Sequence, residues 1–153
     1  MKLAEALALR ADCRRRVEQL RARITGSATY QEGAEPAEDA AALLAEADRV
    51  LDELESLIRR VNRTNSVTDL GVDGTLTDAL ARRDALRLRH SVLVAAADAA
   101  SGHGGYRQLR SELRQVSALP VTELRTRADG VARDVRELDA RIQQANWNVE
   151  LAD

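Results

Sequence analysis

The strongest constraint in this sequence is a set of apolar side chains that recur every three or four residues over long stretches. One uninterrupted set consists of Ala40, Leu43, Ala47, Val50, Leu54, Leu57 and Val61. Another consists of Leu124, Ala128, Val131, Val135, Leu138, Ile142 and Ala145. This alternating spacing is the heptad pattern of helices that pack along their length. The chain is therefore expected to be built from long helices packed side by side.

Four such helices are predicted. The first runs over residues 2–25, with apolar heptad positions at Leu3, Ala6, Cys13, Val17, Leu20 and Ile24. Arg10 occupies the one position of this pattern that is not apolar. The second runs over residues 36–65 with Pro36 in its first turn, the third begins near Thr77 as its N-cap, and the last covers residues 121–146. Helices of this length reach about 30 to 45 Å. The predicted fold class is all-α, an elongated antiparallel bundle of about four long amphipathic helices in a single domain over residues 1–153.

Two connecting segments leave alternatives open. In the turn region at residues 65–75, Val67 and Thr68 are placed to pair with Thr75 and Leu76 as a small β-hairpin. The segment at residues 106–121 fits a short helix, because Leu109, Leu113 and Val116 have helical spacing, whereas its part at residues 112–121 fits an extended conformation equally well.

The composition favours self-association. The chain has 27 Ala and 21 Leu, no Phe and only three aromatic residues in all. Small side chains bury little area, and burial is worth roughly 25 cal/mol per Å² of apolar surface. Leu44, Leu51 and Ile58 add a second apolar row beside the heptad pattern of the second helix, and the stretch at residues 91–101 is apolar nearly all round. We therefore expect a homo-oligomer, with residues 91–101 buried between subunits.

Several protein classes are disfavoured. One Cys forms no internal disulfide and supplies no cysteine-based zinc site, so a reducing, cytoplasmic location is expected. Glu5 interrupts the apolar start of the chain, which predicts no signal peptide, and no uncharged run approaches the roughly 18 residues of a membrane span. The two His residues form no His-x-x-x-His pair, and no nucleophile triad or phosphate-binding glycine loop stands out. The sequence thus predicts no cofactor and no particular reaction.

The charges divide into blocks of opposite sign. Residues 2–23 carry a balance of +4, and residues 32–55 carry a balance of −8. Such blocks can pair the first two helices with each other, or pair across a subunit interface. The alternative is that Arg14, Arg15, Arg16, Arg21 and Arg23 bind RNA, which would give a steep dependence on salt. The near-neutral total charge favours pairing within the protein.

Four polar segments resemble motifs of the septicolysin-like family of small bacterial proteins. They are residues 30–39, 62–65, 83–87 and 142–147, in the same order along the chain. The resemblance implies a helical bacterial protein and no established reaction. The family name suggests a cytolysin, but the expected lack of an export signal, the absence of a long amphipathic strand pair and the scarcity of aromatic residues oppose membrane attack.

Two groups of polar residues are candidate sites. Glu32, Glu35, Glu38 and Asp39 are close in sequence and carry the hard oxygen ligands that divalent cations prefer. The alternative is that Glu38 and Asp39 only cap the second helix. The other group, at helix ends and on the third helix, would bind a small polar ligand or form a structural polar network: Asn62, Thr64, Asn65, Asp84, Arg87, Asn146 and Trp147.

These features favour a self-associating helical protein with a structural or interaction role. A protein that binds a small ligand or divalent metal, with or without an enzymatic activity, is the second hypothesis, and RNA binding through the first helix is the third.

Overall fold

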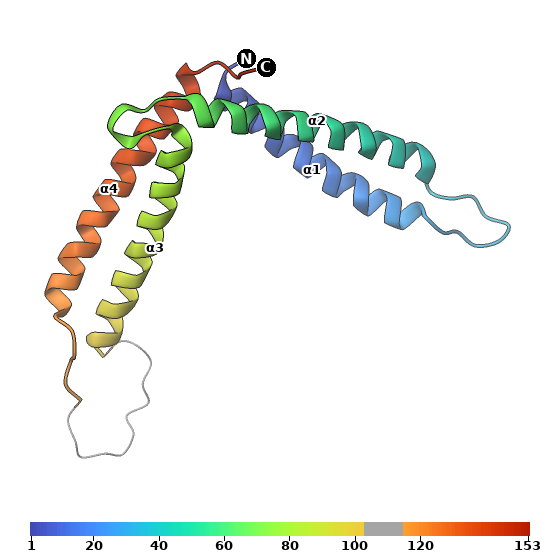
Figure 1. Ribbon diagram of the computed structural model, residues 1–153. Helices are drawn as coiled ribbons and strands as arrows, with labels where there is room; N and C mark the ends of the chain where they lie inside the picture. Colours follow the sequence, from blue (N-terminus) through green and yellow to red (C-terminus); the bar gives the residue numbers. More distant parts are fainter. Residues whose placement is uncertain (103–114) are drawn as a thin grey trace. The chain divides into compact units, whose positions relative to one another are not determined.

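The computed structural model describes residues 1–102 and 115–153, and these residues form four long α-helices (Figure 1). The helices are α1 (Leu3–Ser27), α2 (Ala40–Val67), α3 (Leu76–Ala100) and α4 (Val121–Asn148), with a short 3₁₀ turn, η1 (Gly71–Asp73), before α3. The helices pack antiparallel in pairs, α1 with α2 and α3 with α4, and the described residues contain no strand. The all-α prediction with four long antiparallel helices is confirmed.

The chain divides into two compact units. The first unit contains residues 1–68 and 145–153, and the second contains residues 69–144. The assignment of the whole chain to a single domain stays a prediction.

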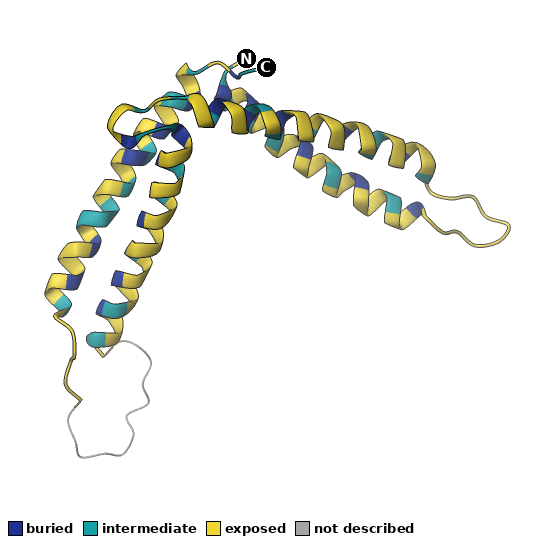
Figure 2. Ribbon diagram, viewed as in Figure 1, coloured by how far each residue is buried: buried dark blue, intermediate teal, exposed yellow. Residues whose placement is uncertain are grey.

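The core of the first unit is the predicted line of contact between α1 and α2. The buried side chains are Leu3, Ala6, Cys13 and Leu20 from α1, and Leu43, Val50, Leu57 and Val61 from α2. These are heptad positions expected from the sequence, because helices pack where apolar side chains repeat on one face. Figure 2 shows that only a narrow part of each helix is buried and that most positions are exposed.

The end of the chain completes this unit beside the start of α1. The backbone N–H of Leu3 donates to the carbonyl of Val149 at 2.9 Å, and that of Leu151 donates to the carbonyl of Met1 at 2.9 Å. Thr64 in α2 is only 1% exposed, and its hydroxyl accepts a hydrogen bond from the backbone N–H of Ala152 at 2.9 Å. The residues after α4 are therefore held by both helices of the first unit.

The core of the second unit lies between α3 and α4. Leu93 and Ala97 of α3 pack with Leu124 and Ala128 of α4. Further along the pair, the buried side chains are Leu76, Ala79 and Leu86 of α3 and Leu138 and Ile142 of α4. The heptad pattern predicted for α4 is confirmed, since its remaining positions are half-buried.

The predicted hairpin is wrong. Val67 is the last residue of α2 and Leu76 the first of α3, so neither is extended. What remains is one isolated antiparallel bridge between Asp69 and Thr75. Only residues 68–75 lie between the two helices, and η1 occupies three of them, so too few residues are left for two strands. Gly71 and Gly74 adopt positive φ angles, which glycine takes without strain, as the chain turns here.

Two predicted helix starts are also wrong. Asp39, not a residue near Pro36, is the N-cap of α2, and its carboxylate accepts from the N–H groups of Ala41 and Ala42 at 3.0 and 3.1 Å. Thr75, not Thr77, is the N-cap of α3. Of the segment predicted as helical or extended at residues 106–121, residues 106–114 lie outside the described residues, and residues 115–120 are neither helix nor strand.

Removing the cap of α3 is expected to destabilise the second unit. The Thr75 hydroxyl accepts from the N–H of Asp78 at 3.2 Å, while the Asp78 carboxylate accepts from the N–H of Thr75 at 2.8 Å. Thr75→Ala breaks this reciprocal pair, and we expect the free energy of unfolding to fall by about 1 kcal/mol. Urea denaturation followed by far-ultraviolet circular dichroism measures the change.

Thr77→Ala is the matched control, because Thr77 is an exposed residue inside the first turn of α3. It is expected to change stability by less than about 0.5 kcal/mol, since Ala is the better helix former. Equal losses for the two variants would contradict the assignment of the cap.

Candidate functional site

Two of the four residues predicted to bind a metal are engaged in other interactions. Glu38 forms a salt bridge with Arg23, which lowers the pKa of the Glu38 carboxyl and raises that of the Arg23 guanidinium. Asp39 caps α2. Glu32 and Glu35 are exposed in the loop that precedes it. Within the described ranges, no group of three or more His, Cys, Asp or Glu side chains is placed to hold a metal ion.

The residues predicted to bind a ligand are divided between the two units. Asn62, Thr64 and Asn65 lie in the last turns of α2, and Asn146 and Trp147 lie in the last turn of α4, all in the first unit. Asp84 and Arg87 lie on α3, in the second unit. A ligand site made of these residues stays a prediction.

The members of this group have different surroundings. Thr64 is fixed to the chain end, as described above, whereas Asn62 is exposed and Asn146 is buried. Trp147 is 63% exposed. Arg87 crosses from α3 to α4 and donates to Asp139 at 2.8 Å, and Asp84 accepts from the adjacent Arg83. No deeply buried side-chain nitrogen or oxygen of the described residues lacks a hydrogen-bond partner.

Two arginines of α1 pair with acidic residues, one on α2 and one in the loop just before it. Arg16 forms an ion pair with Glu46, and Arg23 forms one with Glu38. The pairing predicted from the opposite charge blocks is therefore confirmed for these two arginines. All four side chains are at least partly exposed, so each ion pair contributes little to the free energy of unfolding. Their main effect is to favour the observed alignment of α1 along α2.

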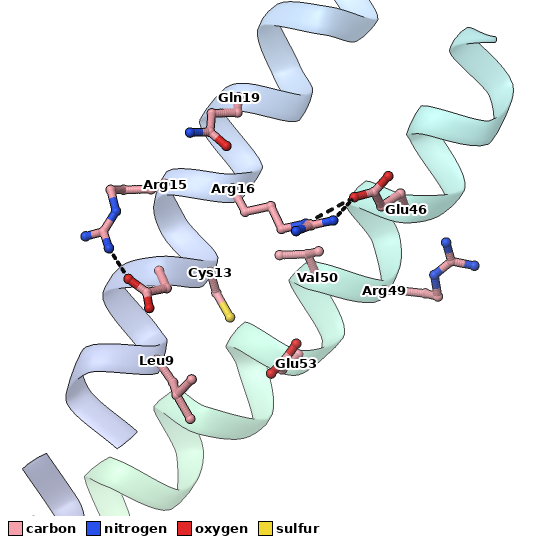
Figure 3. Close-up of a pocket in the computed structure, with 10 residues that line it drawn as sticks. Leu9, Cys13, Arg15, Arg16, Gln19, Glu46, Arg49, Val50 and Glu53 are labelled. Atoms are coloured by element: carbon pink, nitrogen blue, oxygen red, sulfur yellow. Dashed lines mark hydrogen bonds and ion pairs between the residues drawn. The ribbon is translucent and has the colours of Figure 1, made fainter. Parts of the chain in front are cut away.

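A groove runs along the line where α1 meets α2 (Figure 3). Its volume is about 800 Å³, and its floor contains Cys13 and Val50. Charged residues of both signs surround it, and Figure 3 shows Arg16 reaching across to Glu46. Burial, followed by the neighbouring charge of Glu53, raises the pKa of the Cys13 thiol. The thiol is thus held in its protonated, unreactive form, so the groove lacks an activated nucleophile.

A buried carboxylate in the second unit was not anticipated. The side chain of Asp73, in η1, is 1% exposed. One oxygen accepts from Arg82 of α3 at 3.0 Å, and the other accepts from Arg141 of α4 at 2.6 Å. The hydrogen bond from Arg141 is the main cause that lowers the pKa of Asp73, although burial opposes it. The cluster ties the loop to both helices, which is a structural role.

The most unusual surface feature is a set of large apolar side chains left exposed along the helices. Leu44 and Leu51 on α2 are 52% and 44% exposed, and Leu88 and Val92 on α3 are 71% and 67% exposed. The second apolar row predicted on α2 therefore contains two side chains that the chain itself does not cover. In the second unit, Val92 of the stretch at residues 91–101 is likewise exposed, whereas Leu93 and Ala97 are buried.

Among the described residues, no helix is both long enough and apolar enough to cross a membrane.

Comparison with known proteins gives two informative matches. A search of curated proteins returns none. A crystal structure of a functionally unknown conserved protein from Corynebacterium diphtheriae is 39% identical to this chain, with a TM-score of 0.92 over 99% of both chains. Neither match carries a septicolysin description, so the likeness to that family stays a prediction. The second match is a family model that covers residues 10–151, and the chain therefore belongs to the family of unknown function DUF6847.

Proposed function

We propose that this protein is a self-associating helical protein with a structural or interaction role, and that its assembly is its function. The observation that carries the proposal is the exposure of large apolar side chains in regular positions along α2 and α3. Single exposed hydrophobic residues are common on soluble proteins, but apolar residues aligned along one helix face indicate a surface that packs against a partner.

The thin cores of the two units support the same proposal. A pair of helices covers only one face of each helix, and four of the buried positions among the described residues are Ala: Ala6, Ala79, Ala97 and Ala128. Ala buries far less apolar area than Leu, and the hydrophobic contribution scales with that area. Covering a second face of α2 or α3 with another copy would add the apolar contact that the isolated chain lacks.

We place this assembly in the cytoplasm. The support is the single cysteine, Cys13, which is a free and buried thiol. Such a residue behaves as a small apolar side chain and is compatible with a reducing compartment.

Native mass spectrometry of the purified protein tests the proposal. We expect a defined oligomer that persists at micromolar concentration and falls to a single chain mass of 16.8 kDa on denaturation. Light scattering after size exclusion gives an independent mass in solution. A stable monomer at micromolar concentration in both measurements would refute the proposal.

A further inference from the structure

The face of α3 that points away from α4 carries a second complete heptad pattern. Six positions spaced alternately by four and three residues are all apolar, and all are exposed: Ala81, Ala85, Leu88, Val92, Ala95 and Ala99. We call this set the outer seam. The buried positions of α3, which include Leu86 and Leu93, follow the same spacing on roughly the opposite side of the helix.

The outer seam is not explained by the general composition of α3. Between residues 82 and 90 the helix carries Arg82, Arg83, Asp84, Arg87, Arg89 and His90, and none of them falls in the seam. A helix face that is exposed to solvent tolerates charged residues, so selection for solubility alone does not explain their absence from the outer seam over about five turns. Apolar residues at every position of a heptad pattern are typical of a helix with a helical partner.

We infer that the outer seam pairs with the outer seam of a second copy of this chain, with the two α3 helices parallel and in register. The inference rests on the proposed function and specifies the surface through which self-association occurs. The first support is the identity of the central residues. The spacing places Leu88 at heptad position d and Val92 at position a. In parallel coiled coils, a β-branched residue at a combined with Leu at d favours two strands over three or four, so these residues fit a dimer.

The charges beside the seam also select this arrangement. Asp84 occupies position g and Arg89 occupies position e of the following heptad. In a parallel, in-register pair these positions face each other across the interface, so each Asp84 meets the Arg89 of the other copy, twice in the dimer. Within the described parts of the chain, Arg89 has no salt bridge and Asp84 is paired only with its neighbour Arg83.

The antiparallel arrangement is disfavoured by the same charges. Large residues at the middle of the seam and Ala at both ends would also allow α3 to pair with a reversed copy of itself. That pairing brings the two Arg89 side chains together and places Asp84 beside Asp98 of the other copy. Like charges held close together oppose binding. Side-chain size is compatible with both arrangements of the α3 pair, but the charges favour the parallel one.

Disulfide trapping tests the arrangement in the full-length chain. In a Cys13→Ala background, Ala85→Cys is expected to form a covalent dimer rapidly on mild oxidation, because the two copies of residue 85 face each other in a parallel pair. In the antiparallel pair they would be separated by about 15 Å along the helix. Trapping only in a mixture of Ala85→Cys and Ala95→Cys chains would overturn the parallel arrangement.

Charged substitutions on two faces test which surface associates. Leu88→Glu with Val92→Glu is expected to raise the dissociation constant of the dimer roughly tenfold or more, since it places charge in a closed apolar interface. Leu44→Glu with Leu51→Glu is the matched control on α2 and is expected to leave the dimer intact. Circular dichroism and thermal unfolding of the monomeric fraction verify that each variant folds.

Exchanging the charges at residues 84 and 89 tests whether these two side chains pair across the dimer interface. This test leaves the apolar residues of the outer seam unchanged. Asp84→Arg and Arg89→Asp are each expected to weaken the dimer, and the double variant is expected to restore it.

These outcomes distinguish the inference from the proposed function. A monomeric wild-type protein would refute both. An oligomer that resists the α3 variant, or that dissociates only with the α2 variant, would overturn the inference and leave the proposed function standing.

Discussion

Leu138→Ala is expected to lower the free energy of unfolding of the second unit by about 3 kcal/mol. Leu138 lies on α4 and is 1% exposed. Deleting a buried Leu side chain removes its transfer free energy and leaves a cavity, and the total cost depends on how far the neighbours can move into the space. Several of the buried positions in this unit are Ala, which has no side-chain rotation with which to fill a cavity. The expected cost therefore lies within the range of about 2 to 5 kcal/mol that buried Leu→Ala substitutions show.

Urea denaturation followed by circular dichroism gives the value, and Leu44→Ala is the control. Leu44 is 52% exposed and lies outside the interface inferred on α3. Its substitution is expected to change stability by less than about 0.5 kcal/mol. If Leu138→Ala cost no more than the control, the core assigned to α3 and α4 would be wrong.

The long helices could be predicted from the sequence because the signal that specifies them is local. In α4, the spacing of Leu124, Ala128, Leu138 and Ile142 identifies the helix and the face that it buries, and no information from elsewhere in the chain is needed. Such a pattern constrains the interior of a helix strongly and its ends weakly.

The ends were mispredicted where several neighbouring residues could cap. Thr75 and Thr77 are both acceptable N-caps, and the choice depends on the path of the preceding loop. That path is set by Gly71 and Gly74, whose positive φ angles turn the chain so that Thr75 arrives in an extended conformation. Local propensity does not contain this information.

The sequence could predict that the first two helices attract each other through opposite charges, but it could not predict which individual residues pair. The opposite net charges of the first two helices predicted contact, and Arg16 with Glu46 provides it. The same reasoning left Glu38 as a candidate metal ligand, because the sequence does not show that Arg23 reaches it.

The cluster around Asp73 was missed for a similar reason. Its partner Arg141 is 68 residues away in the sequence. An Asp-Gly dipeptide is the usual signature of a turn, and the residues next to Asp73 in the sequence do not indicate that its carboxylate is buried. Only the packing of η1 against α3 and α4 turns this carboxylate into a buried one.

Asp73→Asn is expected to lower the free energy of unfolding by about 2 kcal/mol at neutral pH. The amide keeps the shape of the side chain but replaces one acceptor oxygen by a donor, which faces an arginine. Removing one partner of a fully buried ion pair costs about 3 to 5 kcal/mol. The cost is smaller here because the side chains of Arg82 and Arg141 are 58% and 45% exposed, so water can solvate them once the carboxylate is gone.

The pH dependence of this loss identifies the carboxylate as its source. The arginines hold the pKa of Asp73 in the folded protein below its ordinary value of 3.8. Folding therefore favours the ionised form, and the contribution to stability is fully present above the unfolded pKa and disappears as the pH falls through the folded pKa. The difference between the wild type and Asp73→Asn should accordingly be constant from neutral pH down to about pH 5 and should narrow in stronger acid.

Urea denaturation at a series of pH values measures this difference, with Asp129→Asn as the control. Asp129 is an exposed carboxylate on α4 in the same unit, so its substitution is expected to produce little loss at any of these pH values. A difference for Asp73→Asn that stayed constant into strong acid would mean that the substitution acts through altered packing. The charge on Asp73 would then not be what fixes η1 to α3 and α4.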